Sequence, residues 1–182
     1  MARIPTLDRE HLSSQGQAAF DQIAGSRGNV AVNFKALLNS PEATARFAHL
    51  GAYLRFEGPV PNQLKEVAIL AVARETDGHY VWTAHERLAR KAGVKDEVID
   101  AIRGRRVPQD AVPEAIAMVR YAWSLLRDHR VEEDLFREVQ RYLGDQGMVD
   151  LTLLIGYYAT MSLAISALDV EMEPGVTSTL NP

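Results

Sequence analysis

Apolar side chains recur at helical spacing along nearly the whole sequence. Residues three and four apart lie on one face of an α-helix, and proline suits the first turn of one. The clearest series follows Pro113 and comprises Val112, Ala115, Ile116, Val119, Ala122, Trp123 and Leu126. No run of strict apolar and polar alternation is long enough to predict a β-sheet. The pattern therefore predicts an all-α fold.

Glycine and proline set the boundaries of the expected helices, because proline is favoured in a first turn and glycine just past the last. The positions of these glycines and prolines predict about seven or eight helices. We expect them over residues 9–24, 41–57, 61–76, 79–91, 96–103, 113–126, 132–143 and 148–168, with a short turn at 34–38. We expect a single domain over residues 1–182, with an N-terminal extension at about 1–30. The C-terminal arm, about 170–182, lacks periodicity, so we expect it to be ordered only against a neighbour.

The longest uncharged run, residues 151–168, approaches the length of a membrane span. It contains Thr152, Thr160, Ser162 and Ser166, and it is flanked by Asp150 and Asp169 rather than by basic anchors. We therefore expect a helix buried on nearly all sides, in the core or at a subunit interface, and no membrane association. Its small residues at four-residue spacing would allow another helix to approach closely; they are Gly156, Thr160 and Ala164.

Composition narrows the classes of function. With 20 Lys and Arg against 24 Asp and Glu, the formal charge is −4, which leaves no large positive field for nucleic acid. The N-terminal segment has no apolar stretch of the kind that a secretory signal needs, so we expect a cytoplasmic protein. The sequence contains no cysteine, which excludes disulfides, thiolate-bound metals and thiol nucleophiles.

Candidate chemistry concentrates between residues 64 and 85. Glu66 precedes an apolar run, so its carboxylate should be partly buried and need a partner. His85 follows on a second helix after the turn at Asp77 and Gly78, and antiparallel packing would bring the two side chains together. A carboxylate that orients an imidazole is the usual arrangement for a general acid or base near neutral pH. A purely structural pair is the alternative, and the pattern alone does not decide between them.

Four further side chains are candidates for binding a substrate. Tyr80 and Trp82 share the helix of His85. Arg74 lies near the face of Glu66 and could receive an anion, with an ion pair to a neighbouring carboxylate as the alternative. Tyr157 could line a pocket, with core packing as the alternative.

No metal site is expected. His85 and the acidic residue after it begin like a zinc-protease helix, but position 89 is Ala where the second histidine ligand would stand.

The order of these residues resembles the carboxymuconolactone decarboxylase family, which belongs with the alkylhydroperoxidase D-like proteins. The resemblance rests on Glu66, Tyr80-Val81-Trp82, His85 and Ala92-Gly93-Val94, and on the segment from Met148 to Tyr158. It covers roughly residues 30–175. It implies an all-α helical bundle assembled as a homo-oligomer, commonly a trimer or hexamer.

In the peroxidase branch of these proteins, a pair of cysteines precedes the histidine at positions that here are Gly78 and Val81. Thiol peroxidase activity is therefore excluded at this site. The cysteine-free branch instead implies cofactor-free decarboxylation of a small anionic lactone such as 4-carboxymuconolactone. His85 would then donate the proton, and Glu66 would orient the imidazole of His85. A lactone isomerase or hydrolase, or a non-catalytic oligomeric protein that binds small molecules, are the alternatives.

Overall fold

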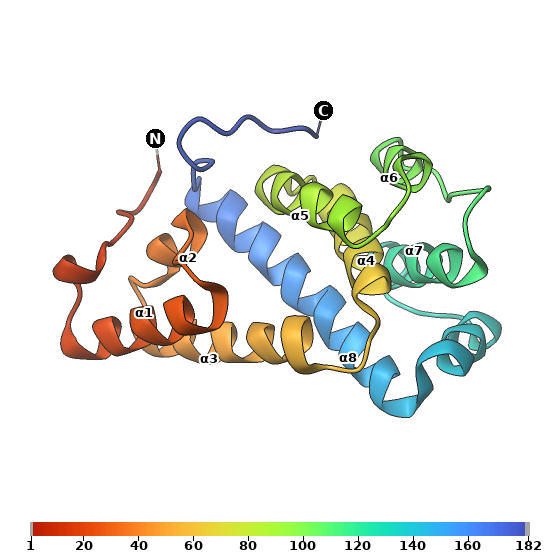
Figure 1. Cartoon of the computed structure of the whole chain (residues 1–182), viewed down its shortest axis with the longest axis horizontal. Helices are drawn as coiled ribbons and strands as arrows, with labels where there is room; N and C mark the ends of the chain where they lie inside the picture. The colour runs from red at the N-terminus through yellow and green to blue at the C-terminus, as the bar shows by residue number, and fades with distance from the viewer. Residues whose placement is uncertain (1, 181–182) are drawn as a thin grey trace. The chain divides into compact units, whose positions relative to one another are not determined.

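The computed structural model describes residues 2–180, and these contain eight α-helices and no β-strand (Figure 1). This confirms the all-α prediction. A 3₁₀ turn (Arg9–His11) and a π-helical turn (Tyr53–Glu57) accompany the α-helices. The α-helices are α1 (Ser14–Arg27), α2 (Val32–Leu37), α3 (Pro41–Ala52), α4 (Asn62–Glu75), α5 (His79–Lys91), α6 (Asp96–Arg103), α7 (Pro113–Arg127) and α8 (Glu133–Leu168).

The first expected helix is displaced toward the C-terminus. The helix begins after Ser13, whose side chain accepts a hydrogen bond from the Gly16 amide at 3.3 Å, and it continues through Gly25 to Arg27. It ends at Gly28, which adopts φ 82°. The expected start at residue 9 and stop at residue 24 are therefore wrong, because the capping serine and the left-handed glycine set the ends.

The described chain divides into two compact units. The first comprises residues 2–57 and 164–177, in which α1 packs along α3 and α2 contacts α3. The second comprises residues 58–163 and 178–180 and contains α4 to α7 with most of α8. A single domain over residues 1–182 stays a prediction.

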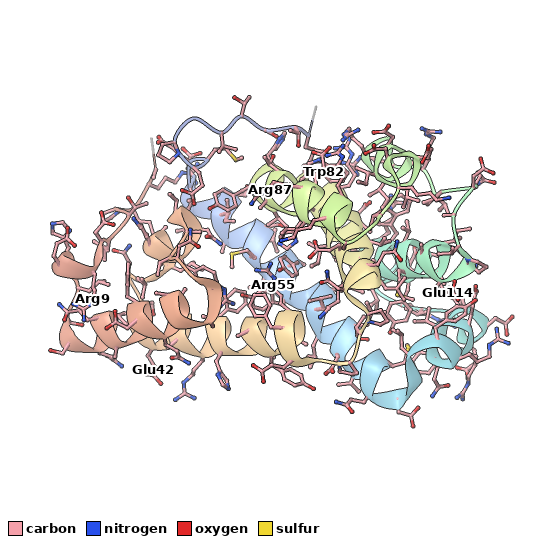
Figure 2. All side chains as sticks on the ribbon, viewed as in Figure 1. Arg9, Glu42, Arg55, Trp82, Arg87 and Glu114 are labelled. Atoms are coloured by element: carbon pink, nitrogen blue, oxygen red, sulfur yellow. The ribbon has the colours of Figure 1, made fainter. Side chains whose placement is uncertain are left out.

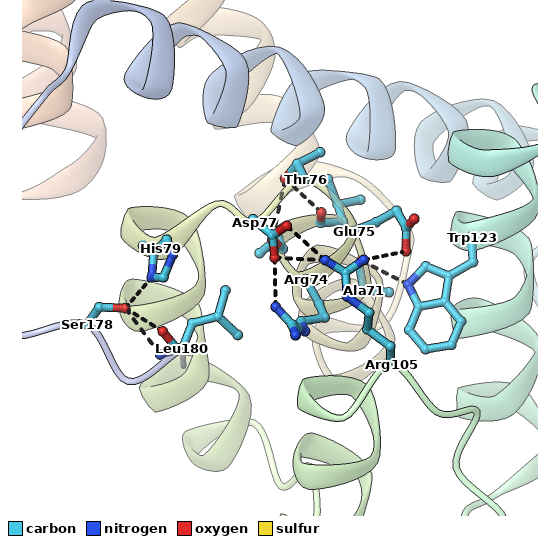
Figure 3. Close-up of polar contacts among 12 residues, drawn as sticks. Ala71, Arg74, Glu75, Thr76, Asp77, His79, Arg105, Trp123, Ser178 and Leu180 are labelled. Carbon is cyan, nitrogen blue, oxygen red and sulfur yellow. Dashed lines mark hydrogen bonds and ion pairs between the residues drawn. The ribbon is translucent and has the colours of Figure 1, made fainter. Parts of the chain in front are cut away.

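Helix α4 is the centre of the second unit. Every residue from Leu64 to Arg74 is buried, and α4 contacts α5, α6 and α7. A helix with apolar residues on all its faces is stable only when other helices surround it, and the sequence of α4 has that character. The indole nitrogen of Trp123 on α7 donates to the backbone carbonyl of Ala71 on α4 at 3.0 Å, which fixes the packing of these two helices (Figure 3).

Helix α8 is broken at Gly144, which has φ 66° and ψ −179°, so the break lies where the sequence predicted the end of a helix. Among the described residues, α8 alone is long and apolar enough to cross a membrane by length and composition. One side of it is core, since Leu151, Leu154 and Tyr158 are buried. Within this chain its opposite side is exposed at Val149, Leu153 and Leu163. Burial of that side at a subunit interface stays a prediction.

Candidate active site

Glu66 and His85 meet in the core of the second unit. Helix α4 ends at the turn where Asp77 has φ 46° and the Gly78 amide donates to the Ala73 carbonyl at 2.7 Å. This reversal lays α5 against α4 and places the His85 Nδ1 atom 2.7 Å from Glu66 Oε2. The two side chains are 7% and 6% exposed. The hydrogen bond is therefore shielded from water.

This geometry assigns different tasks to the two imidazole nitrogens. In the tautomer that carries its proton on Nδ1, His85 donates this hydrogen bond to Glu66 Oε2. The proton that His85 exchanges with another molecule must then pass through Nε2. The pair has the arrangement that general acid catalysis requires.

A tyrosine of α8 packs against the imidazole of His85. The ring of Tyr158 lies edge-on to His85, with the ring centroids 4.8 Å apart and the planes at 81°. Tyr157 in turn packs edge-on against Tyr158 at 5.2 Å. The sequence favoured Tyr157 as the residue of this pair that binds substrate, but the structure places Tyr158 against the imidazole.

Trp82 lies in a different network from Glu66. Its indole ring is fully buried, and its nitrogen donates to Glu86 Oε2 at 3.1 Å. The Arg103 guanidinium of α6 stacks over the same ring at 5.4 Å from its centroid. Figure 2 marks Trp82 on α5. The other candidate on this helix, Tyr80, is half-buried in its first turn.

Glu86 is the centre of that second network. Its carboxylate accepts hydrogen bonds from Arg90 at 2.9 Å, from Arg103 and from the Thr179 hydroxyl. Burial raises the pKa of the Glu86 carboxyl, but the bonds from Thr179 and Arg90 and the charges of Arg103 and Arg90 outweigh it and hold that pKa below its ordinary value. Glu86 therefore stays ionised in the core, where it ties α5 to α6.

Arg74 is held by a neighbouring carboxylate. One of its terminal nitrogens donates to Asp77 Oδ1 at 2.7 Å, and Arg105 donates to both oxygens of the same carboxylate at 2.8 Å (Figure 3). The Arg74 Nε atom is buried and has no hydrogen-bond partner. The ion pair with Asp77 is thus formed, and in this structure Arg74 braces the turn between α4 and α5.

Residues 41–123, which include both Glu66 and His85, match the model of the carboxymuconolactone decarboxylase family. This segment, a little under half of the chain, therefore has the sequence pattern of that family. No protein of curated function matches the sequence significantly.

Solved structures share the fold. A peroxidase-related protein with an alkylhydroperoxidase AhpD core, from Ralstonia eutropha JMP134, superposes with a TM-score of 0.79 at 18% identity over 95% of this chain and 93% of its own. A peroxidase-related protein from Silicibacter sp. TM1040 gives 0.73 at 21% identity over 94% and 90%. A cysteine-to-alanine variant of the debrominase Bmp8, in complex with 2,3,4-tribromopyrrole, gives 0.71 at 16% identity over 94% and 91%.

The structure shows the surroundings of Gly78 and Val81, the two positions where the resemblance places the cysteines of the peroxidase branch. At position 78, a Cβ atom would lie 2.6 Å from the Ser162 hydroxyl oxygen, so a side chain there would require Ser162 to shift. That hydroxyl is buried and has no hydrogen-bond partner. Val81 is a buried apolar residue. Neither position carries a thiol, because the sequence contains no cysteine.

The C-terminal arm contacts the same helix. Ser178 Oγ lies 2.8 Å from His79 Nδ1 (Figure 3). The Thr179 amide donates to Thr83 Oγ1 at 3.2 Å. Leu180 is buried. The arm was expected to be ordered only against a neighbour, but residues 178–180 pack on α5 of their own chain; residues 181 and 182 lie outside the described part.

Two further observations concern metal binding and an open hollow on the described chain. Between residues 2 and 180, no group of three or more His, Asp or Glu side chains is arranged to hold a metal ion. An open hollow is lined by Lys95, Asp96, Glu97 and Asp110 and contains none of the candidate site residues. The described contacts therefore concentrate the candidate chemistry at Glu66, His85 and Tyr158.

Proposed function

We propose that this protein is a cofactor-independent acid–base enzyme that decarboxylates a small anionic lactone or a related aromatic-derived acid. The observation that carries the proposal is the buried hydrogen bond of 2.7 Å between Glu66 and His85 in a chain without cysteine. The family contains enzymes that act on small molecules, and its name describes a lactone decarboxylase. His85 is the proton donor in this proposal and Glu66 is its positioning residue.

The chemistry of decarboxylation needs such a pair. When the bond between the ring carbon and the carboxylate breaks, carbon dioxide leaves. The electron pair of the broken bond stays on the substrate and delocalises over the lactone. A protonated His85 gives its Nε2 proton to the carbon that receives this electron pair. The resulting neutral imidazole keeps the proton on its own Nδ1 atom, which stays hydrogen-bonded to Glu66. Neither step requires an electron acceptor or a thiol.

The proposed substrate, location and assembly follow from the sequence and from the family resemblance. The substrate is a small organic anion that needs no bound cofactor, and the enzyme works in the cytoplasm without nucleic acid or membrane. The resemblance further suggests a homo-oligomer, a trimer or hexamer. Tyr80, Trp82, Arg74 and Tyr157 remain proposals as substrate-binding residues, and the position of Tyr158 adds a fifth.

The first test is the reaction itself. Purified protein is mixed with 4-carboxymuconolactone, and loss of ultraviolet absorbance is followed together with released carbon dioxide. Turnover with one carbon dioxide per substrate consumed is the expected result. Consumption without carbon dioxide would overturn the decarboxylase and indicate a lactone isomerase or hydrolase. Absence of any turnover, with this and with a panel of related lactones and acids, would favour the binding protein.

A further inference from the structure

Helix α8 presents two buried polar side chains to α5, four residues apart and so on one face. The first, Tyr158, packs edge-on against the imidazole of His85. The second, Ser162, lies against the start of α5, where a Cβ atom at position 78 would be 2.6 Å from its hydroxyl oxygen. Seven residues separate position 78 from His85, which corresponds to about 10 Å along a helix. This face of α8 therefore places a hydroxyl group about two turns of α5 away from the proposed proton donor.

The hydroxyl of Ser162 has no role in the hydrogen bonding of the chain. The residue is 3% exposed, and its Oγ atom has no hydrogen-bond partner among the described residues. A second hydroxyl at the same place, that of Thr76, lies 3.2 Å from the Cβ position of residue 78. It does have a partner, because it donates to the Val72 carbonyl at 2.9 Å (Figure 3). Of these two hydroxyl groups, only that of Ser162 is left for another molecule.

Helix packing does not explain why position 162 is a serine. The close approach of α8 to Gly78 needs a small side chain there, but alanine is smaller than serine and is a better helix former. A buried hydroxyl without a partner also lowers the stability of a fold. Such groups are rare in native proteins, and a role in catalysis or binding is a recognised reason for them. The Ser162 hydroxyl is thus better suited to binding a ligand than to stabilising the chain.

We infer that Ser162 is a substrate-binding residue whose hydroxyl donates a hydrogen bond to a carboxylate oxygen of the substrate. This role rests on the proposed function, in which the substrate is a small organic acid that must reach His85. Gly78, Val81 and His85 share one face of α5, and Val81 is a buried apolar residue. A hydrogen bond from Ser162 to a carboxylate is stronger in such apolar surroundings than in water. Ser162 holds the end of the acid that is remote from the carbon protonated by His85, so it contributes to binding and not to proton transfer.

Ser162→Ala separates a role in binding from a role in stability. The variant should raise KM for 4-carboxymuconolactone, or for whichever acid the protein turns over, by roughly 10-fold, since it loses a hydrogen bond to a charged group. Because the lost contact is made equally before and during the reaction, kcat should stay within about twofold of wild type. Stability in urea should be unchanged or raised. Ser166→Ala, at an exposed position of α8, is the matched control and should change neither KM nor stability.

Failure of this role can be distinguished from failure of the proposed reaction. If the wild type turns over its substrate and Ser162→Ala keeps the wild-type KM, the reaction stands and the role of Ser162 is wrong. A raised KM in a variant that is also less stable than wild type would likewise overturn it, since a structural serine gives that result. If the wild type turns over none of the lactones and acids, calorimetry with the same compounds replaces the kinetics. A Kd raised roughly 10-fold in Ser162→Ala then supports the role, and an unchanged Kd, or no binding by the wild type, overturns it.

Discussion

At the scale of single residues, Glu66 contributes to the proposed reaction only through His85. Replacing Glu66 with Gln keeps the size of the side chain but removes the charge that favours the imidazolium. We expect kcat/KM to fall roughly 100-fold, within the range found when an acid–base pair is disrupted. The pH dependence of kcat/KM should also change, because a neutral amide no longer offsets the positive charge. A loss of thermal stability with an unchanged rate and pH profile would show that the pair is structural.

Glu86 makes a separate prediction, for stability. Its pKa is lower in the folded protein than in the unfolded chain, so it stabilises the fold above the unfolded value of about 4.3, and this contribution is lost as the pH falls through the folded value. Glu86→Gln should therefore lower the free energy of unfolding by about 1–3 kcal/mol at pH 7. The difference from wild type should shrink as the pH falls below about 4.

Urea denaturation between pH 7 and pH 3 measures this difference. Glu97→Gln, at an exposed position of α6, is the matched control and should have little effect. A Glu86→Gln deficit that stays constant across this pH range would mean that the ionised carboxylate is not what stabilises the network.

At the scale of helices, the contact of α5 with α8 depends on Gly78. Gly78→Ala would place a Cβ 2.6 Å from Ser162 Oγ, so it should destabilise the fold by about 1–3 kcal/mol. Ser162→Ala removes an oxygen that has no hydrogen-bond partner, so alone it should be neutral or slightly stabilising. The double variant should recover part of the loss, as measured by a thermodynamic cycle from urea denaturation. Gly25→Ala, in open space on α1, is the control and should not destabilise. Strictly additive effects of the two changes would contradict the close contact.

The helices themselves were largely predictable because their ends carry local signals. Pro41 and Pro113 start α3 and α7, and Gly144 marks the break in α8. The first helix begins later than predicted because the capping side chain of Ser13 sets its start. The choice between Tyr157 and Tyr158 was beyond the sequence, because adjacent residues on a helix point about 100° apart and only the packing of α8 selects one of them.

At the scale of the whole molecule, the reversal between α4 and α5 could be predicted, and with it the approach of Glu66 to His85. The place of Trp82 could not, since its partner Arg103 comes from another helix. The sequence likewise contains no signal that predicts the contact of Thr179 with Glu86, because 93 residues separate the two along the chain. Contacts of this kind depend on how the helices turn their faces, and local periodicity does not encode that.

Composition also makes a prediction for the whole molecule. Because the sequence has no cysteine, it offers no thiolate to attack a peroxide. Reduction of an organic hydroperoxide in the presence of a dithiol reductant should therefore stay at the rate of a protein-free control. A rate above that control, proportional to protein concentration, would contradict this exclusion.

The central claim is that His85 transfers the proton in the reaction, and kinetics of two histidine variants test it most directly. His85→Gln removes the titrating group, whereas His49→Gln removes an exposed histidine on α3. With 4-carboxymuconolactone as substrate, or whichever lactone the protein turns over, kcat/KM of the His85 variant should fall by about 10² to 10⁴-fold, while the His49 variant keeps the wild-type value. Both should retain wild-type circular dichroism. A folded His85→Gln protein that keeps wild-type turnover would contradict the account.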